Sequence, residues 1–164
     1  MFLKLQTIVL FLLITVTFVL AQSDKEWNEK GKDLYKQDEY EEAIKCYDKA
    51  IKLNPKYVDA WNNKGWTLSC YGEYEEAIKC YNKAIELDPK YVNAWNDKGW
   101  ALYCLDKYEE AIKCYNKAIE LDPKHVNPWY NKGVALEKLG KYEEAIKCYN
   151  KAIELDPKHV DAWL

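Results

Sequence analysis

The chain has 164 residues and a formal net charge of −3, and lysine and glutamate are intermixed along most of it. Because it has neither a basic arm nor an acidic tail, its charge gives no basis for binding nucleic acid. With 7 tryptophans and 14 tyrosines but few glycines and prolines, it is also unlike a disordered polymer. Its length is that of one ordinary domain.

The first 21 residues have the layout of a secretory signal peptide. One lysine, Lys4, precedes the uncharged run IVLFLLITVTFVLA. The run ends in VLA, which puts small or short side chains at the two positions that a signal peptidase reads, directly before Gln22. The alternative is an uncleaved membrane anchor, because residues 2–21 are just long enough to cross a bilayer of about 30 Å as a helix. In either case we expect the protein to act outside the cytoplasm, secreted or held at a membrane.

From residue 24 onward the sequence repeats itself every 34 residues. The block EEAIKCYNKAIELDPK occurs unchanged at residues 75–90, 109–124 and 143–158, and a near copy fills residues 41–56. Such a period marks a stacked array, in which each unit buries its apolar face against its neighbours. The predicted units are residues 24–57, 58–91, 92–125 and 126–159, and residues 160–164 begin an incomplete fifth.

Each unit contains two helical patterns joined by a short turn. In the second unit Trp61, Gly65 and Leu68 form one stripe of a first helix. The stripe of the second helix comprises Tyr74, Ala77, Tyr81, Ala84 and Ile85. Between them Gly72 suits a left-handed position at the end of a helix, and Pro89 ends the second helix. We therefore expect an antiparallel helix pair in every unit.

This pattern resembles the tetratricopeptide repeat signature, with matches at Trp61, Gly65, Leu68, Tyr74, Ala77, Tyr81, Ala84 and Pro89. The resemblance covers residues 24–157. It implies an all-α, right-handed superhelical solenoid of antiparallel helix pairs, with first helices lining a concave groove and second helices outside. One departure recurs, because lysine stands where the family usually has leucine, and we expect its stem to lie on the apolar stripe. These residues are Lys30, Lys64, Lys98 and Lys132.

Variation between the units is concentrated in the first helices. The second helices repeat almost unchanged, so they offer little by which a partner could be recognised at one unit rather than another. The variable face includes Trp66, about 140° round the helix from Trp61, and the resemblance assigns this face to the groove. The predicted partner-binding residues are Asn28, Lys32, Tyr35, Asn62, Trp66, Cys70, Asn96, Trp100, Tyr103 and Tyr130.

Within this set we expect Trp66 and Trp100 to grip an apolar side chain of a bound peptide. The alternative is that both tryptophans fill the seams between neighbouring first helices. We expect the asparagines Asn28, Asn62 and Asn96 to hydrogen-bond the peptide backbone.

The charged residues of this face bear on whether the groove binds an acidic segment or a terminal carboxylate. The lysines of the first unit, Lys25, Lys32 and Lys36, either receive an acidic stretch of a partner or are simply solvated. Family members that bind chaperone tails clamp a terminal carboxylate with lysine, arginine and asparagine. The matching positions here hold Asn28, Lys32, Asn93 and Asp97, so we do not expect that activity.

The cysteine and histidine spacings indicate neither disulfides nor catalysis. Four cysteines recur on successive second helices, which pack about 8–10 Å apart, whereas a disulfide needs Cα atoms within about 7 Å. We expect these four, Cys46, Cys80, Cys114 and Cys148, to be small buried hydrophobes. Cys70 and Cys104 lie on the groove face and are better candidates for thiol chemistry or a metal contact. Since no catalytic triad, phosphate loop or zinc spacing is present, we predict no catalytic residue, cofactor or metal.

The sequence therefore predicts a non-catalytic, exported scaffold that binds a peptide segment of a protein partner in its concave groove. The alternative is a structural protein that self-assembles end to end through its incomplete fifth unit, where Trp163 is in register. That alternative predicts a homo-oligomer. Membrane contact is expected only if residues 1–21 remain attached.

Overall fold

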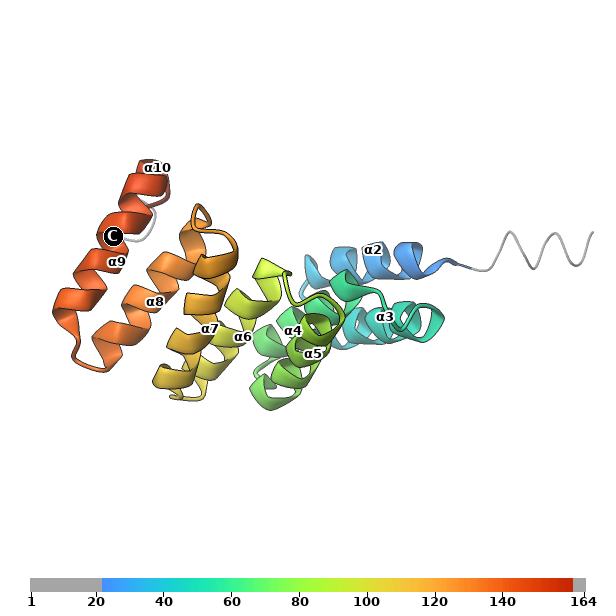
Figure 1. Cartoon of the computed structure of the whole chain (residues 1–164). Coiled ribbons are helices and arrows are strands. Elements are labelled where there is room, and N and C mark those ends of the chain that lie inside the picture. The colour runs from blue at the N-terminus through green and yellow to red at the C-terminus, as the bar shows by residue number, and fades with distance from the viewer. Residues whose placement is uncertain (1–21, 161–164) are drawn as a thin grey trace, which may run out of the picture.

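The computed structural model describes residues 22–160, and over this range it contains helices and turns and no strand. The helices are α2 (Asp24–Tyr35), α3 (Tyr40–Leu53), α4 (Val58–Tyr71), α5 (Tyr74–Leu87), α6 (Val92–Cys104), α7 (Tyr108–Leu121), α8 (Val126–Lys138), α9 (Tyr142–Leu155) and α10 (Pro157–Val160). Four antiparallel pairs follow one another in sequence order (Figure 1). The prediction of an all-α solenoid is confirmed. The predictions for residues 1–21 and for Trp163 fall outside the described residues.

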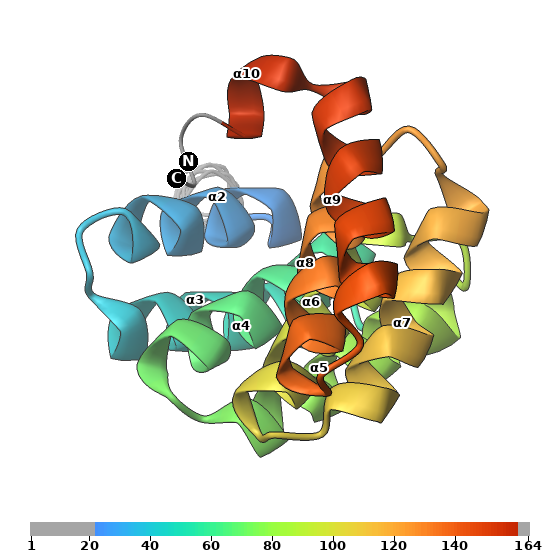
Figure 2. The ribbon, with the colours of Figure 1, turned by 90° about the vertical axis from the view of Figure 1, so that its left-hand side faces the viewer.

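The helix pairs stack with a twist. From α4 onward, each first helix packs against its own second helix, against the second helix before it and against the preceding first helix. Within residues 22–160 no Cα atoms of consecutive second helices lie within 8 Å of one another, whereas those of consecutive first helices do. The first helices are therefore closer together and lie on the inside of the curve. Viewed along the stack, α2 and α3 run across the picture whereas α9 runs up it (Figure 2).

A tyrosine ring fills the space beside a glycine in every pair. A Cβ atom on Gly65 would lie 2.7 Å from Cε1 of Tyr81, and one on Gly99 would lie 2.5 Å from Cε1 of Tyr115. Both tyrosines are fully buried. The signature glycine is thus required by the packing of a ring from the second helix.

The turns within the pairs need a residue with positive φ. Gly72 and Gly140 have φ of 91° and 72°, as the sequence predicts for a left-handed position. In the other two pairs Asp38 and Asp106 occupy the equivalent place with φ of 60° and 58°. Aspartate tolerates this region better than most residues because its short side chain bonds locally, so all four turns keep one geometry.

In the last three pairs, the tryptophan of the first helix bonds to the loop before it. The indole Nε1 of Trp61 donates to the carbonyl oxygen of Pro55 at 3.0 Å, and Trp95 and Trp129 repeat this bond with Pro89 and Pro123. The Nζ atom of Lys98 lies 5.8 Å from the centre of the Trp95 ring. This agrees with the expectation that lysine at this position lays its stem along the stripe.

The two ends of the array differ in chemistry. At positions where the inner first helices carry buried small residues such as Ala60 and Thr67, α2 carries the acids Glu26 and Asp33. Glu26 and Ser23 also form a reciprocal capping box at the start of α2. At the other end α9 exposes apolar side chains, including Tyr142 and Ile146. The N-terminal end therefore has a polar cap, whereas the face of α9 is apolar.

Candidate partner-binding groove

Hydrogen bonds between side chains join the first helices along the inside of the curve. The Nδ2 atom of Asn63 in α4 donates to Oδ1 of Asn28 in α2 at 3.0 Å, and Asn131 in α8 donates to Asn96 in α6 at the same distance. Between these two contacts, Nδ2 of Asn62 donates to Oδ2 of Asp97 at 3.1 Å. Each bond links residues 35 positions apart, one unit plus one residue.

The asparagines predicted to bind a peptide backbone belong to these seams. Asn28 is only 2% exposed, and its own Nδ2 donates to the hydroxyl of Tyr57 at 3.4 Å. Asn62 and Asn96 are also buried, and both donate to Asp97. The side-chain NH2 groups of all three asparagines therefore donate within the protein, because this helix position faces the neighbouring first helix. The buried Oδ1 of Asn62 accepts no hydrogen bond from a described residue.

Three first helices converge on a pocket of about 350 Å³ in the groove. Its lining comes from α4, α6 and α8 and comprises Trp66, Asn96, Asp97, Trp100, Asn127, Tyr130 and Asn131. Four of these residues belong to the predicted set, and the structure brings them together from three units. Asp97, Asn127 and Asn131 were outside that set. One signal for Asp97 was available in the sequence, because the same position holds asparagine in the second and fourth units.

The two groove tryptophans are held differently. Trp66 is half-buried, and its Nε1 donates to the hydroxyl of Tyr35 at 2.7 Å, so it both fills a seam with α2 and faces the pocket. Trp100 is 37% exposed and stacks on Tyr103 at 5.5 Å between ring centroids. Trp100 is therefore the more available of the two aromatic surfaces. Seam filling, the alternative considered from sequence, describes part of the role of Trp66.

The remaining predicted residues lie outside the pocket. Lys32 forms an ion pair of 3.0 Å with Glu29 on its own helix, and Lys36 pairs with Asp33 at 2.9 Å. The Tyr35 hydroxyl lies 3.5 Å from Sγ of the exposed Cys70. Two of the three first-unit lysines considered, Lys32 and Lys36, thus already have acidic partners, which weakens the case for an acidic partner there.

Asp97 is the charged residue of the pocket. Burial raises its pKa to about 6, and hydrogen bonds from Asn62 and Asn96 oppose this rise by favouring the charged form. Each carboxylate oxygen accepts one bond of 3.1 Å, Oδ2 from Asn62 and Oδ1 from Asn96. Within residues 22–160 no lysine or histidine forms an ion pair with it.

Four of the cysteines are buried in the core, as predicted. Cys46, Cys80, Cys114 and Cys148 are 5–6% exposed, and burial raises the pKa of Cys80 to about 11. All six thiols are free. The described part of the chain contains no group of three histidine, cysteine, aspartate or glutamate side chains that could hold a metal ion.

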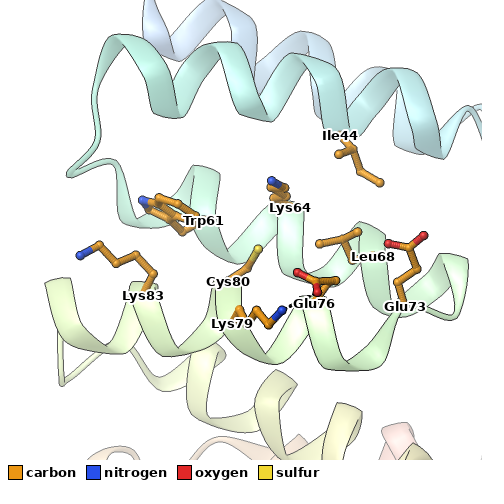
Figure 3. Close-up of a pocket in the computed structure, with 9 residues that line it drawn as sticks. All are labelled: Ile44, Trp61, Lys64, Leu68, Glu73, Glu76, Lys79, Cys80 and Lys83. Carbon is orange, nitrogen blue, oxygen red and sulfur yellow. Dashed lines mark hydrogen bonds and ion pairs between the residues drawn. The ribbon is translucent and has the colours of Figure 1, made fainter.

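A second cleft, of about 500 Å³, lies on the outer side between α3, α4 and α5 (Figure 3). Trp61, Lys64 and Leu68 of α4 line it together with residues of α5, and Ile44 reaches it from α3. Lys64 already forms an ion pair of 2.6 Å with Asp48. Because its α4 residues recur at 34-residue spacing, this cleft has the composition of the common scaffold and offers less to distinguish a partner than the groove pocket.

Comparison with protein families supports the repeat assignment. One model described as a tetratricopeptide repeat matches residues 58–91 and 126–159. Another with the same description matches residues 80–113. A third, described as a TPR repeat, matches residues 31–68 and 99–140. Together the matches run from residue 31 to residue 159 without a gap. The chain belongs to the tetratricopeptide repeat family. A comparison with curated proteins finds no match.

Solved structures of tetratricopeptide repeat proteins share the fold. A crystal structure of MamA is 27% identical with a TM-score of 0.71, over 77% of this chain and 74% of that one. MamA from Desulfovibrio magneticus RS-1, at 23% identity and a TM-score of 0.75, covers 82% of this chain and 76% of its own, and shows the fold alone. The first tetratricopeptide domain of Spaghetti (RPAP3), described as bound to the HSP90 peptide SRMEEVD, is 28% identical with a TM-score of 0.70. That match covers 73% of this chain and 94% of the domain.

Proposed function

We propose that this protein is a non-catalytic adaptor that binds a peptide segment of a partner protein in its concave groove. The observation that carries the proposal is the pocket in which Trp66, Trp100 and Tyr130 meet from three successive first helices. The outer helices repeat one sequence, whereas this part of the groove differs from unit to unit. A related domain of known structure is described as holding a peptide, which supports the same role here.

The pocket has the properties of an energetic centre for binding. Aromatic side chains that become buried at an interface contribute about 2 kcal/mol or more each when they act as anchors. Trp100 is pre-positioned by its stacking on Tyr103, and Trp66 by its hydrogen bond to Tyr35. Because both rings are already ordered, little conformational entropy is lost when a ligand covers them.

We further propose that the adaptor acts outside the cytoplasm, on the basis of the signal-like residues 1–21. The helices described between residues 22 and 160 include none long and apolar enough to cross a membrane. N-terminal sequencing of the protein from its native source tests this proposal. We expect the mature chain to begin at Gln22, and a chain that retains Met1 would contradict cleavage and favour the anchor.

End-to-end self-assembly is a second candidate, favoured by the exposed face of α9. Ile146 is 56% exposed there, whereas the equivalent Ile78 and Ile112 pack against the core of the following pair. The opposite end of a second copy would present the acids Glu26 and Asp33, which suit an apolar face poorly. We therefore place groove binding first. If self-assembly occurs, the molecular mass should rise with concentration and fall in Trp163→Ala, whereas a monomer at every concentration would exclude it.

Affinity capture from extracellular or envelope material, analysed by mass spectrometry, tests the adaptor role. The double variant Trp66→Ala/Trp100→Ala should lose the captured partners while its helical circular dichroism stays unchanged. The double variant Tyr142→Ala/Ile146→Ala is the matched control, because it removes two exposed apolar side chains from α9 instead. Capture of the same partners by the groove variant would show that the groove assignment is wrong.

A further inference from the structure

We propose that the groove pocket receives a positively charged side chain, lysine or arginine, of the bound peptide, with Asp97 as its counter-ion. This inference rests on the proposed function, because it names the ligand chemistry of the same pocket. The observation behind it is a carboxylate without a cationic partner, set among aromatic rings from three helices.

The walls of the pocket suit a cation. Trp66, Trp100 and Tyr130 supply aromatic surfaces, and a cation within about 6 Å of such a ring is attracted by its negative face. The other lining side chains besides Asp97 are neutral amides, so no positive charge lines the pocket to repel such a ligand. The volume of about 350 Å³ is near the lower end of small-ligand pockets, which fits one long side chain better than a folded segment.

The carboxylate of Asp97 has capacity left for a ligand. An ionised carboxylate offers about four acceptor sites, and here two are taken by the amides of Asn62 and Asn96. These bonds orient the group but supply no positive charge. A buried carboxylate without a cation is unfavourable, and an entering ammonium or guanidinium group would provide the missing charge and a charge-assisted hydrogen bond.

The comparison between units indicates that this carboxylate is specific to one pocket. At the position of Asp97 the second and fourth units hold Asn63 and Asn131, each of which donates a hydrogen bond to an asparagine of the preceding first helix. The first unit holds Glu29, whose carboxylate already pairs with Lys32 at 3.0 Å. Asp97 is therefore the one member of this series that combines a negative charge with a pocket and has no lysine partner among residues 22–160. A ligand carboxylate at this place would be repelled.

Small capped amino acids provide a direct test. The probes are N-acetyl-arginine methylamide and N-acetyl-lysine methylamide, each paired with a neutral analogue, the citrulline and the side-chain-acetylated lysine compounds. Binding is followed by NMR through the indole Nε1–H signals of the ¹⁵N-labelled protein. We expect saturable shifts at Trp66 and Trp100 with the cationic probes only. Trp95 and Trp129 serve as internal references, because their indoles bond to Pro89 and Pro123 outside the pocket.

Asp97→Asn is the decisive variant, since asparagine occupies this position in two other units of the same chain. We expect it to weaken binding of the cationic probes by roughly tenfold or more through loss of the charge-assisted contact. Glu86→Gln, which removes the same charge from the exposed surface of α5, should leave binding unchanged. Unshifted reference indoles would show that Asp97→Asn remains folded.

Three results would overturn the inference: equal shifts with charged and neutral probes, undiminished binding by Asp97→Asn, or no saturable shift with either cationic probe. Each of these leaves the adaptor role itself intact, because that role is decided by partner capture with the Trp66→Ala/Trp100→Ala variant. A groove that captures a partner but ignores cationic probes would keep the proposed function and discard the ligand chemistry.

Discussion

The side-chain amide of Asn62 donates a hydrogen bond of 3.1 Å to the carboxylate of Asp97 and so joins α4 to α6 across the seam between two units. The bond holds a partly desolvated acid in place beside the pocket of the groove. Asp97 is therefore both part of the scaffold and a candidate contact for a ligand. The first role affects the stability of the protein and the second affects ligand binding, so the two can be measured separately.

The first prediction concerns the stability of the unliganded protein. Because burial raises the pKa of Asp97 from 3.8 to about 6, the folded state binds its proton more tightly than the unfolded state does. Its contribution to stability is therefore fully present below about pH 4 and is lost as the pH rises through about 6. Asp97→Asn should gain free energy of unfolding relative to the parent between about pH 4 and pH 7, by about 1–3 kcal/mol.

Urea unfolding of both proteins at several pH values checks this difference. Three nearby tyrosines interact electrostatically with Asp97, but they do not obscure the pH dependence of this difference. Their pKa values are raised above the usual range, so they stay neutral between about pH 4 and pH 7. They are Tyr81, Tyr91 and Tyr115. Glu86→Gln serves as the control for loss of one negative charge. A difference between Asp97→Asn and the parent that does not change with pH would contradict the raised pKa.

The second prediction concerns the packing of a ring against a glycine. Gly99→Ala should lower the free energy of unfolding by about 1–3 kcal/mol, because the added Cβ would lie 2.5 Å from the buried ring of Tyr115. Gly140→Asp is the control, since Asp38 and Asp106 adopt positive φ at the equivalent position and nothing lies within 4 Å of a Cβ there. Chemical denaturation of the two variants should separate them clearly, and equal losses would show that steric crowding is not the reason for Gly99.

The third prediction concerns thiol reactivity. In the native protein a thiol reagent should label the exposed Cys70 rapidly, and Cys104 more slowly because burial raises its pKa. The four core cysteines should react only on unfolding, because they are buried and burial raises the pKa of each. Mass spectrometry of labelled peptides gives the order directly. Rapid labelling of Cys80 in the folded protein would contradict the packing described above.

The fourth prediction compares equivalent residues at an inner and an outer seam. Ile112 packs against the core of the following pair, whereas Ile146 at the same position of α9 is largely exposed. Ile112→Ala should therefore cost about 1–3 kcal/mol more in free energy of unfolding than Ile146→Ala. If the two losses are equal at a concentration where the protein is monomeric, α9 is covered by something that the described residues do not show.

Much of the fold was predictable because the same sequence pattern recurs every 34 residues. The spacing of Trp61, Gly65 and Leu68 set the first helix, and Gly72 and Pro89 marked the ends. The asparagine seams were not predictable in the same way. Their partners lie one unit plus one residue apart, a relation that depends on the rotation between helix pairs rather than on the pattern within one.

The candidate site was predictable only in part. Trp66, Trp100 and Tyr130 differ from the common scaffold and could be assigned to one face, but their convergence on one pocket follows from the curvature of the array. Asn28 and Asn62 share the periodicity of that face and yet are buried, because the neighbouring first helices approach one another there. The significance of Asp97 depends on this same burial, which no single helix reveals.

The most direct test of the central claim is the affinity of a defined peptide for the groove. A peptide selected from a random display library against the parent protein would be titrated by calorimetry into the parent, Trp66→Ala/Trp100→Ala and Tyr142→Ala/Ile146→Ala. We predict that the groove variant binds roughly a hundredfold or more weakly, since it loses two aromatic anchors, and that the α9 variant binds like the parent. Undiminished binding by the groove variant would contradict the claim that this protein recognises its partner through the groove.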